Sequence, residues 1–365
     1  MRILTPAIVL CMIVGFSFIA FGAQLPGKSE DPGNLRAREL MQKQKSGQKL
    51  TDEEGAFVKQ QKRGKNGQGA KGGNEGKKGA GRGTEQMPTF ADISYGPDTS
   101  NKIDFWKAES PTPAPLVVFI HGGGFSGGDK GAHDGALLAT CLKNGISYAS
   151  INYRLSGVAP YPAQMRDCAR AIQFLRSKAA EWNIDPKRLA CTGGSAGAGI
   201  SEWLAFHDDL ADPKSADPVA RQSTRLSCAL PTNMQCTYDP REIKKIVPGK
   251  AYDVGALKQL QGLPETFNWD NDPIDADLDA RLRDCSPITH LTKDDPPIFA
   301  MNNNANEKDG NIHHPNFGRY LKKHMDAIGL ECEFHLTSDF PEAEARADAM
   351  LAFLKKNFGM KTKAE

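Results

Sequence analysis

The feature that most constrains the fold is an apolar strand that leads directly into a glycine-rich turn and then into a helix. The strand is expected at Arg188–Cys191, the turn is Gly193-Gly194-Ser195-Ala196-Gly197, and the helix is expected at Ala196–Phe206. A tight strand-to-helix turn holds its central residue in strained backbone geometry, with neighbours so close that only small side chains fit. This context predicts that Ser195 is a nucleophile held at the head of a helix, rather than part of an ordinary glycine-rich turn.

A second glycine-rich loop lies upstream, directly after the apolar run Leu116–Ile120. Its sequence is His121-Gly122-Gly123-Gly124, and without side chains its backbone N–H groups can approach a developing negative charge. We expect the N–H groups of Gly123, Gly124 and Ala196 to form an oxyanion hole. A merely flexible loop would not explain the position after a buried strand and before the serine turn.

From about Met87, short β-branched runs alternate with amphipathic stretches, which is typical of an α/β domain. The expected strands are Asp92–Tyr95, Ile103–Lys107, Leu116–Ile120, Ser147–Asn152, Arg188–Cys191, Ser227–Leu230, Ile298–Met301 and Cys332–Leu336. The expected helices are Gly135–Leu142, Pro162–Trp182, Ala196–Phe206, Phe317–Ala327 and Glu342–Phe358. The sequence therefore predicts a mostly parallel eight-stranded sheet with helices on both faces, over residues 87–365.

Further motifs accompany the two glycine-rich loops, and they extend over most of this domain. They are His121–Lys130, Ile151–Leu155, Tyr161-Pro162-Ala163, Asn183-Ile184-Asp185-Pro186, Gly193–Gly199 and Pro296-Pro297. From about Leu116 to the C-terminus the chain resembles α/β-hydrolase-fold carboxylesterases of the hormone-sensitive-lipase-like group, near bacterial feruloyl and acetyl xylan esterases. The resemblance implies the α/β-hydrolase fold, a serine-dependent ester hydrolase, and a structural place for Asp167 at a helix start.

The resemblance also implies a catalytic acid just after the strand Ile298–Met301. A rough alignment puts this position at Asn306, and the same loop offers the carboxylates of Glu307 and Asp309. Either could orient a histidine, or both could be ordinary solvated loop residues. The acid is therefore expected to be Asp309 or Glu307.

The general base is expected in the loop after the last strand, but no histidine follows His335 in the sequence. His335 lies inside the expected strand Cys332–Leu336, so it comes early for this role. It is the preferred candidate, ahead of His313 or His314, and a chain without any base is the remaining alternative. Without a base, the hydrolytic rate should fall by several orders of magnitude.

The sequence predicts no metal, nucleotide or organic cofactor. Adjacent histidines such as His313 and His314 point apart, and no third ligand follows at helical spacing, so this pair is not expected to bind a metal. His207, near the end of a helix, is expected to act as a capping or dipole partner.

A long irregular insertion is expected at about residues 232–295. Between Ala251 and Asp295 it holds 10 Asp and Glu against 4 Lys and Arg. Loops at the carboxyl ends of parallel strands surround the ligand crevice, so the insertion is expected to cover the acyl or alcohol pocket and to disfavour anionic substrates. The alternative is a surface excursion that does not touch substrate.

The N-terminal region has a different texture. Met1-Arg2 and the apolar run Ile3–Gly22 predict a signal peptide over residues 1–23, with an uncleaved membrane anchor as the alternative. Residues 24–86 hold 14 Lys and Arg against 8 Asp and Glu, with nine glycines between Gly64 and Gly83. Such a segment predicts a disordered basic linker, and few aromatic residues accompany its charges, so a solvated spacer is favoured over a nucleic-acid-binding tail.

Seven cysteines remain after Cys11 is removed with the signal peptide. An odd number leaves at least one thiol unpaired if all bridges are internal, and Cys228 with Cys236 is one possible pair.

These observations together predict a secreted or periplasmic serine hydrolase that cleaves carboxylic esters, with Ser195 as its nucleophile. Its substrate would be a small-molecule or polysaccharide-linked ester, with no nucleic-acid partner and no stable membrane span after signal cleavage. The main alternative is a hydrolase scaffold that has lost its base and persists as a binding module. A peptidase of the same fold is a third possibility, because specificity depends on pocket shape.

Overall fold

Strand β3 (Ala114–Ile120) sets the layers of the domain, because every one of its residues is buried. Leu116, Val118 and Ile120 belong to the hydrophobic core on one face of the sheet, and Val117 and Phe119 belong to a second core on the other face. A strand that is apolar on both faces needs a covering layer on each side.

The computed structural model describes Lys43 and residues 86–361. The residues from 86 onward belong to one compact unit, Arg82–Glu365. The predicted signal peptide (1–23) and, apart from Lys43 and Gln86, the predicted basic linker (24–86) lie outside the described residues, so export remains a prediction. No helix within the described part of the chain has the length and apolar character that a bilayer crossing requires.

The sheet has eight strands in the order β1-β2-β4-β3-β5-β6-β7-β8, which confirms the predicted fold class. Strands β2 and β1 pair antiparallel at one edge, and the remaining neighbours pair in parallel apart from β2 with β4. The other strands are β1 (Phe90–Ser94), β2 (Lys102–Trp106), β4 (Ser147–Ile151), β5 (Ile184–Gly194), β6 (Cys228–Thr232), β7 (Ile298–Asn302) and β8 (Cys332–Leu336). Strand β5 is longer than the predicted segment Arg188–Cys191 and runs directly into the serine turn.

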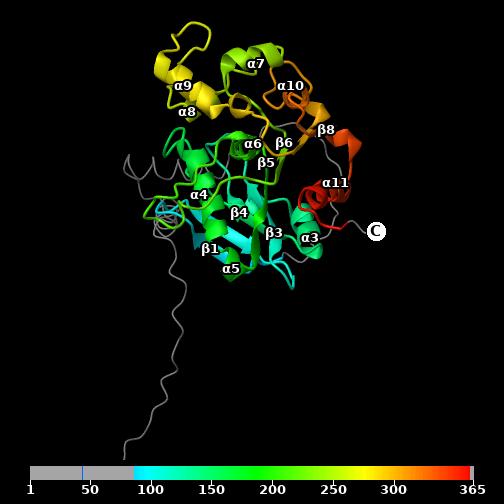
Figure 1. Ribbon diagram of the computed structural model, residues 1–365. Coiled ribbons are helices and arrows are strands. Elements are labelled where there is room, and N and C mark those ends of the chain that lie inside the picture. Colours follow the sequence, from blue (N-terminus) through cyan, green and yellow to red (C-terminus); the bar gives the residue numbers. More distant parts are fainter. Residues whose placement is uncertain (1–42, 44–85, 362–365) are drawn as a thin grey trace, which may run out of the picture. The chain divides into compact units, whose positions relative to one another are not determined.

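Helices cover both faces of the sheet. Helices α3 (Gly135–Lys143) and α11 (Ala343–Asn357) pack against each other on the face of Val117 and Phe119 (Figure 1). The opposite face is covered by α4 (Ala163–Ser177), α5 (Ala179–Trp182), α6 (Ala196–Phe206) and α10 (Asn316–Ala327). The predicted helix Pro162–Trp182 is interrupted at Lys178, where the backbone (φ −91°, ψ 3°) leaves the helical region.

The segment between β6 and β7 contains three short helices and a 3-10 turn. They are α7 (Pro240–Ile246), α8 (Gly255–Leu260), α9 (Ala276–Cys285) and η2 (Pro287–His290). Figure 1 shows α7, α8 and α9 gathered beyond α6, at the end of the sheet to which the parallel strands run. The remaining 3-10 turns are η1 (Lys130–Ala132), η3 (Asn304–Asn306) and η4 (Thr337–Asp339).

All seven cysteines from Cys141 to Cys332 are buried free thiols, so the possible bridge between Cys228 and Cys236 is not formed. The Cys236 thiol instead lies 3.6 Å from the Phe317 carbonyl oxygen, to which it donates. Burial raises the pKa of Cys191 to about 12, and the other six thiols shift in the same direction. The core therefore owes its stability to packing, with no covalent crosslink among the described residues.

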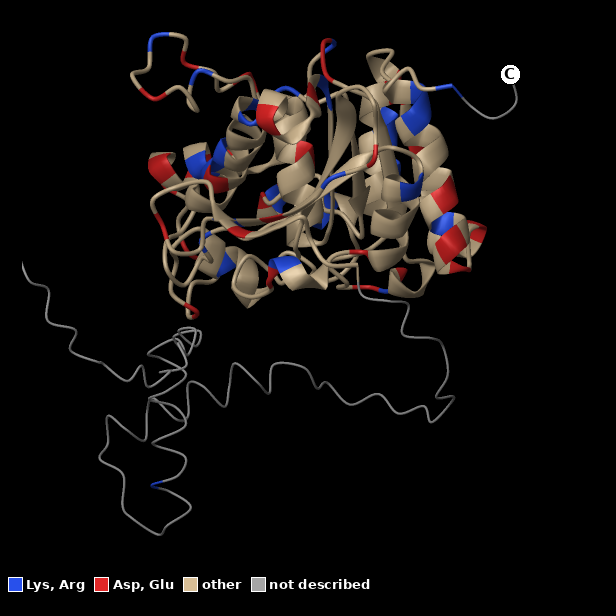
Figure 2. Ribbon diagram, turned by 90° about the horizontal axis from the view of Figure 1, so that it is seen from below, with Lys and Arg blue, Asp and Glu red and all other residues tan. Residues whose placement is uncertain are grey.

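Charge on the surface of this domain is mixed in sign. Figure 2 shows Lys and Arg interspersed with Asp and Glu along the helices. Long-range attraction to a polyanion needs a concentrated field of one sign, and interspersed charges weaken such a field.

Asp167 lies in α4. Its carboxylate holds the segment that follows β4 and the residue just before β2, rather than any catalytic group. Its buried carboxylate accepts hydrogen bonds from Nε (2.8 Å), Nη2 (2.6 Å) and the backbone N–H (3.0 Å) of Arg154, and from Nδ2 of Asn101 at 3.0 Å. This is the structural place that the sequence predicted for it.

Replacing Asp167 by Asn should lower the free energy of unfolding by about 2–3 kcal/mol, because the buried carboxylate accepts from N–H donors at both of its oxygens, and an amide offers only one acceptor oxygen and no charge. Urea denaturation measures this loss. Asp326→Asn removes the partner of an exposed pair, Lys322 with Asp326, and should leave the midpoint at the wild-type value. Equal losses in the two variants would contradict the role assigned to burial.

Candidate active site

The serine turn is held by backbone-to-backbone packing. Ser195 has φ 53° and ψ −118°, a strained conformation for a residue with a side chain, and its N–H donates to the Thr232 carbonyl at 3.0 Å. A Cβ atom at Gly193 would lie 2.7 Å from the Gly197 carbonyl carbon, and one at Gly197 would overlap the Ile120 carbonyl oxygen. The glycines of this motif are therefore required by the contact between α6 and the end of β3.

The loop after β3 is fixed by a buried histidine. His121 donates from Nδ1 to the Gly122 carbonyl at 2.8 Å and stacks on Tyr153, with ring centroids 4.3 Å apart. Tyr153 in turn donates its hydroxyl proton to the His121 carbonyl at 2.8 Å. Gly123 and Gly124 follow with φ +111° and +61°, a region that favours glycine. Burial lowers the pKa of His121, so the ring is neutral and acts as a support for the loop.

His313 is the histidine that meets the serine. Its Nε2 lies 2.8 Å from Ser195 Oγ, a hydrogen-bonding distance. The residue lies in the loop between η3 and α10, and its backbone is held on both sides: the N–H donates to Oδ1 of Asn311 at 2.8 Å, and the carbonyl accepts from Nδ2 of Asn302 at 3.3 Å. Gln235 donates to the carbonyl of the preceding residue, Ile312, at 3.0 Å.

Burial alone lowers the pKa of His313 from its ordinary value of about 6.5. The imidazole is therefore neutral at pH 7, which is the form that can accept a proton from a hydroxyl group.

The preferred candidate for the base, His335, is corrected by the structure. Its side chain points to one face of β8 and packs against Phe299 and Phe340, with ring centroids 4.8 and 5.1 Å away. Its Nε2 lies 3.5 Å from Glu333. A residue inside a strand projects to one face of the sheet, whereas Ser195 lies beyond the strand ends, so His335 does not reach it.

The two candidate acids are also placed away from the base. Glu307 is exposed and pairs with Arg319 at 2.7 Å, and exposed Asp309 makes no hydrogen bond or ion pair with His313. Both carboxylates act electrostatically on the neighbouring His314 instead, whose Nδ1 accepts from the Asn316 N–H. Across residues 86–361, no carboxylate oxygen lies within 4.0 Å of a His313 ring nitrogen.

An amide occupies the position where the resemblance places the acid. Asn306 accepts a hydrogen bond from Nδ2 of Asn311 at 3.4 Å, and Asn311 accepts the His313 N–H. The loop thus supports the backbone of His313 with neutral groups and places no charge against its ring.

Ser195 and His313 border a cavity of about 380 Å³. The two predicted oxyanion-hole glycines and Ala196 contribute to its wall, and the insertion contributes the apolar residues Val254, Ala256 and Leu257. The other lining residues are Phe125, Gln235, Tyr238 and Ile312. The structure therefore brings together Ser195, Gly123, Gly124 and Ala196 at one cavity. The histidine at this cavity is His313, which was a candidate for the base after His335.

Gln235 and Tyr238 were not identified from the sequence. Both follow β6, at the carboxyl edge of the sheet where ligand crevices form, and this position was the available signal. The same signal applies to His313, which follows β7.

NMR titration of the histidine ring protons should give a midpoint below 6.5 for His313, because burial disfavours the charged ring and no carboxylate faces it. A His313→Gln variant assigns the resonance. Any activity that needs neutral His313 should be fully present at pH 7 and be lost as the pH falls through that midpoint. A midpoint above 6.5 would reveal a negative partner and contradict the geometry.

Comparison with known proteins gives matches to one family of sequences. Residues 104–316 match the BD-FAE family, which is more than half of the chain. The probable carboxylic ester hydrolase LipM of Mycobacterium tuberculosis is 28% identical over 221 residues, covering 58% of this chain and 46% of LipM. Carboxylesterase NlhH of the same organism is 37% identical over 101 residues, covering 28% of this chain and 32% of NlhH. The matched region thus spans less than half of these relatives.

Solved structures show the same fold. A truncated carbohydrate esterase from gut microbiota has a TM-score of 0.60 at 20% identity, covering 76% of this chain and 99% of the other. Esterase 2 of Thermogutta terrifontis, in its propionate-bound form, has a TM-score of 0.55 at 18% identity, covering 74% of this chain and 96% of the other. At such identities the likeness concerns the α/β-hydrolase fold.

Proposed function

We propose, from the premise that the chain belongs to the BD-FAE family, that it is a serine hydrolase of carboxylic esters. The observation that carries the proposal is the 2.8 Å contact between Ser195 Oγ and His313 Nε2, at the wall of a cavity that Gly123, Gly124 and Ala196 also line. The names of the related proteins, carboxylic ester hydrolase and carboxylesterase, support the same class.

In the proposed reaction, the Ser195 hydroxyl gives its proton to Nε2 of His313 while Oγ bonds to the ester carbonyl carbon. Negative charge develops on the carbonyl oxygen, where the N–H groups of Gly123, Gly124 and Ala196 stabilise it. His313 then returns the proton to the departing alkoxide, which leaves as the alcohol. A water molecule repeats both steps, releasing the carboxylic acid and restoring Ser195.

The proposed base works without a facing carboxylate. In a Ser-His-Asp triad the carboxylate fixes the tautomer of the ring and stabilises the imidazolium. Here the ring is positioned through its backbone, by Asn302 and Asn311, and burial keeps it neutral until the proton arrives. The arrangement is a serine-histidine dyad whose resting state is ready to accept a proton, at the cost of less stabilisation of the charged ring.

The cavity favours esters with a short acyl group. Its volume of about 380 Å³ is near the lower end of the range of roughly 300–1,000 Å³ for ligand pockets. We propose a neutral small-molecule or polysaccharide-linked ester, because the segment Ala251–Asp295 that contains the cavity-lining helix α8 is acidic.

The binding-module alternative depended on the absence of a histidine at Ser195. The contact with His313 removes that ground and favours an enzyme.

His313→Ala should lower kcat/KM for p-nitrophenyl acetate by about 10³-fold or more, because Ser195 loses the group that takes its proton. His335→Ala is the matched control and should stay within about twofold of wild type, because its ring contacts Phe299 and Phe340 rather than the cavity. A reversed result, with His335 essential and His313 dispensable, would refute the dyad.

Asp309→Asn and Glu307→Gln should each leave kcat/KM within about threefold of wild type, because neither carboxylate contacts His313. A loss of two orders of magnitude in either variant would show that the loop rearranges to supply an acid. Fluorophosphonate labelling confined to Ser195, and absent in Ser195→Ala, tests the nucleophile without assuming a substrate.

Hydrolysis of p-nitrophenyl esters should fall steeply with acyl length, with acetate and butyrate far better substrates than palmitate, since the cavity of about 380 Å³, which Val254 and Leu257 help to line, is small. Initial rates across the series measure this. Equal kcat/KM for acetate and palmitate would mean that the cavity does not hold the acyl chain.

A further inference from the structure

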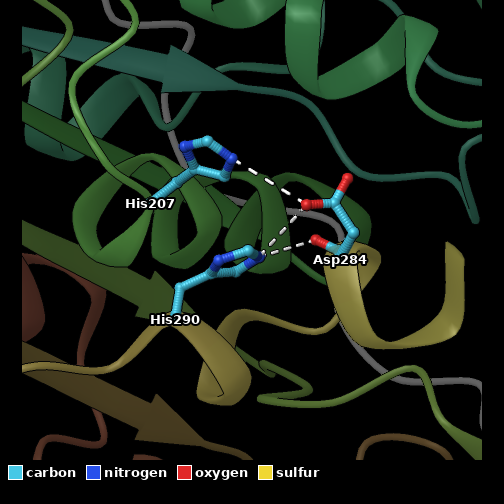
Figure 3. Close-up of side chains that lie close together, drawn as sticks. All are labelled: His207, Asp284 and His290. Carbon is cyan, nitrogen blue, oxygen red and sulfur yellow. Dashed lines mark hydrogen bonds and ion pairs between the residues drawn. The ribbon is translucent and has the colours of Figure 1, made fainter. Parts of the chain in front are cut away.

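Three ligand-type side chains gather outside the catalytic cavity: His207, Asp284 and His290 (Figure 3). His207 directly follows α6 as its C-cap residue, Asp284 lies in α9, and His290 ends η2. One ligand atom from each lies within 4.8 Å of the other two. We propose that these three residues bind a divalent transition-metal ion of the zinc type, a site that the sequence did not predict because its ligands are far apart along the chain.

The distances fit a site that closes slightly around a metal ion. Asp284 Oδ1 lies 3.9 Å from His207 Nε2 and 3.8 Å from His290 Nε2. Two ligands held at about 2.1 Å by one tetrahedral Zn²⁺ lie about 3.4 Å apart. Asp284 and each histidine therefore need to approach by roughly half an ångström, and the two histidine nitrogens, which lie within 4.8 Å of each other, need to close to the same spacing.

The hydrogen bonds of His207 leave the correct nitrogen free. Nδ1 lies 2.9 Å from the Asp208 carbonyl oxygen, which can only accept, so Nδ1 carries the proton of the neutral ring. The lone pair is then on Nε2, the atom directed at Asp284 in Figure 3. A backbone carbonyl that fixes the tautomer in this way is the usual outer support of a metal-bound histidine.

Asp284 is also held from outside. Its Oδ2 accepts a hydrogen bond from the Tyr161 hydroxyl, and its backbone carbonyl accepts from Nε1 of Trp203 at 2.7 Å. These bonds leave Oδ1 to face the two imidazoles. The ring of Trp203 packs against His207 with centroids 4.1 Å apart, which restricts the rotation of that ligand.

His290 must change its hydrogen bond for the metal to bind. Its Nε2 donates to the Asp284 carbonyl at 2.8 Å, so this nitrogen carries a proton in the metal-free state. Metal binding moves that proton to Nδ1 and frees the carbonyl, which keeps its bond from Trp203. The Arg166 guanidinium, 6.0 Å from the centre of the Trp203 ring, adds positive charge nearby, so the affinity comes from coordination rather than from net charge.

Two imidazoles and one carboxylate suit zinc better than calcium or magnesium, which prefer oxygen ligands. The Asp284 side chain is 46% exposed, which leaves a fourth position open to water. A metal ion here would link the end of α6, the helix that begins directly after Ser195, to α9 and η2 of the insertion. It would thus stabilise the segment that also supplies Val254 and Leu257 to the cavity.

The test is titration of the full chain, first treated with a chelator, with Zn²⁺ in a calorimeter and with Co²⁺ as a spectroscopic probe. We expect one site whose Co²⁺ spectrum shows nitrogen and oxygen ligands and no sulfur charge-transfer band, together with a rise in Tm when Zn²⁺ is added. His207→Gln, His290→Gln and Asp284→Asn should each weaken binding at least a hundredfold. His324→Gln and His313→Gln should bind as wild type does, which separates this site from other histidines and from the catalytic cavity.

Tyr161→Phe serves as a second test in case a ligand variant fails to fold, which circular dichroism shows. It keeps all three ligands and removes only the outer hydrogen bond to Asp284, so Zn²⁺ affinity should fall about 10- to 100-fold. The proposal is overturned if wild type binds no Zn²⁺ at 1 mM, if the ligand variants and Tyr161→Phe bind as wild type does, or if the Co²⁺ spectrum shows thiolate ligation. Each of these results is independent of whether the chain hydrolyses esters.

Discussion

The position of Ser195 depends on one contact. It is the contact between the first turn of α6 and the carbonyl of Ile120 at the end of β3. Side chains at Gly193 and Gly197 would fill the space that this carbonyl occupies, so the helix can start there only on bare backbone. The close approach holds Ser195 at φ 53°, a conformation whose cost of about 1–3 kcal/mol has to be met by the packing around it. Every residue of α6 is buried, which provides that packing. The strain is therefore maintained by the core of the whole domain.

The strands of the sheet could be predicted from the sequence, because the central ones are apolar at consecutive positions. A run such as Leu116–Ile120 is apolar at consecutive positions, and only a strand covered on both faces buries such a pattern. The glycine motifs then mark where strands β3 and β5 end, because no other residue type fits there. Sequence alone was sufficient to place the eight strands, the turn that holds Ser195 and the glycine loop after β3, since each of these positions depends on local composition and short-range sterics.

The proposed base and its hydrogen-bond partners could not be predicted in this way. His335 and His313 differ by where their backbones lie relative to the carboxyl edge of the sheet: one lies inside β8 and the other in the loop after β7. That difference depends on tertiary geometry, which no local pattern encodes. The carboxylates of Glu307 and Asp309 are in the expected loop, yet both point to solvent, and neutral Asn306 and Asn311 hold the loop instead. Chain order pointed to the loop after β8 for the base, and only the fold showed that His313, in the loop after β7, faces Ser195.

The buried thiols of this domain have a consequence for its maturation. With seven free cysteines in the described chain, each in a dry environment that keeps the reactive thiolate form rare, the folded state needs no oxidant to hold it together. An oxidising compartment offers these sulfur atoms little opportunity to react once the core has formed, and a reducing one removes nothing that the fold relies on. The folded domain of residues 86–361 is therefore compatible with an oxidising as well as a reducing environment once its core has formed.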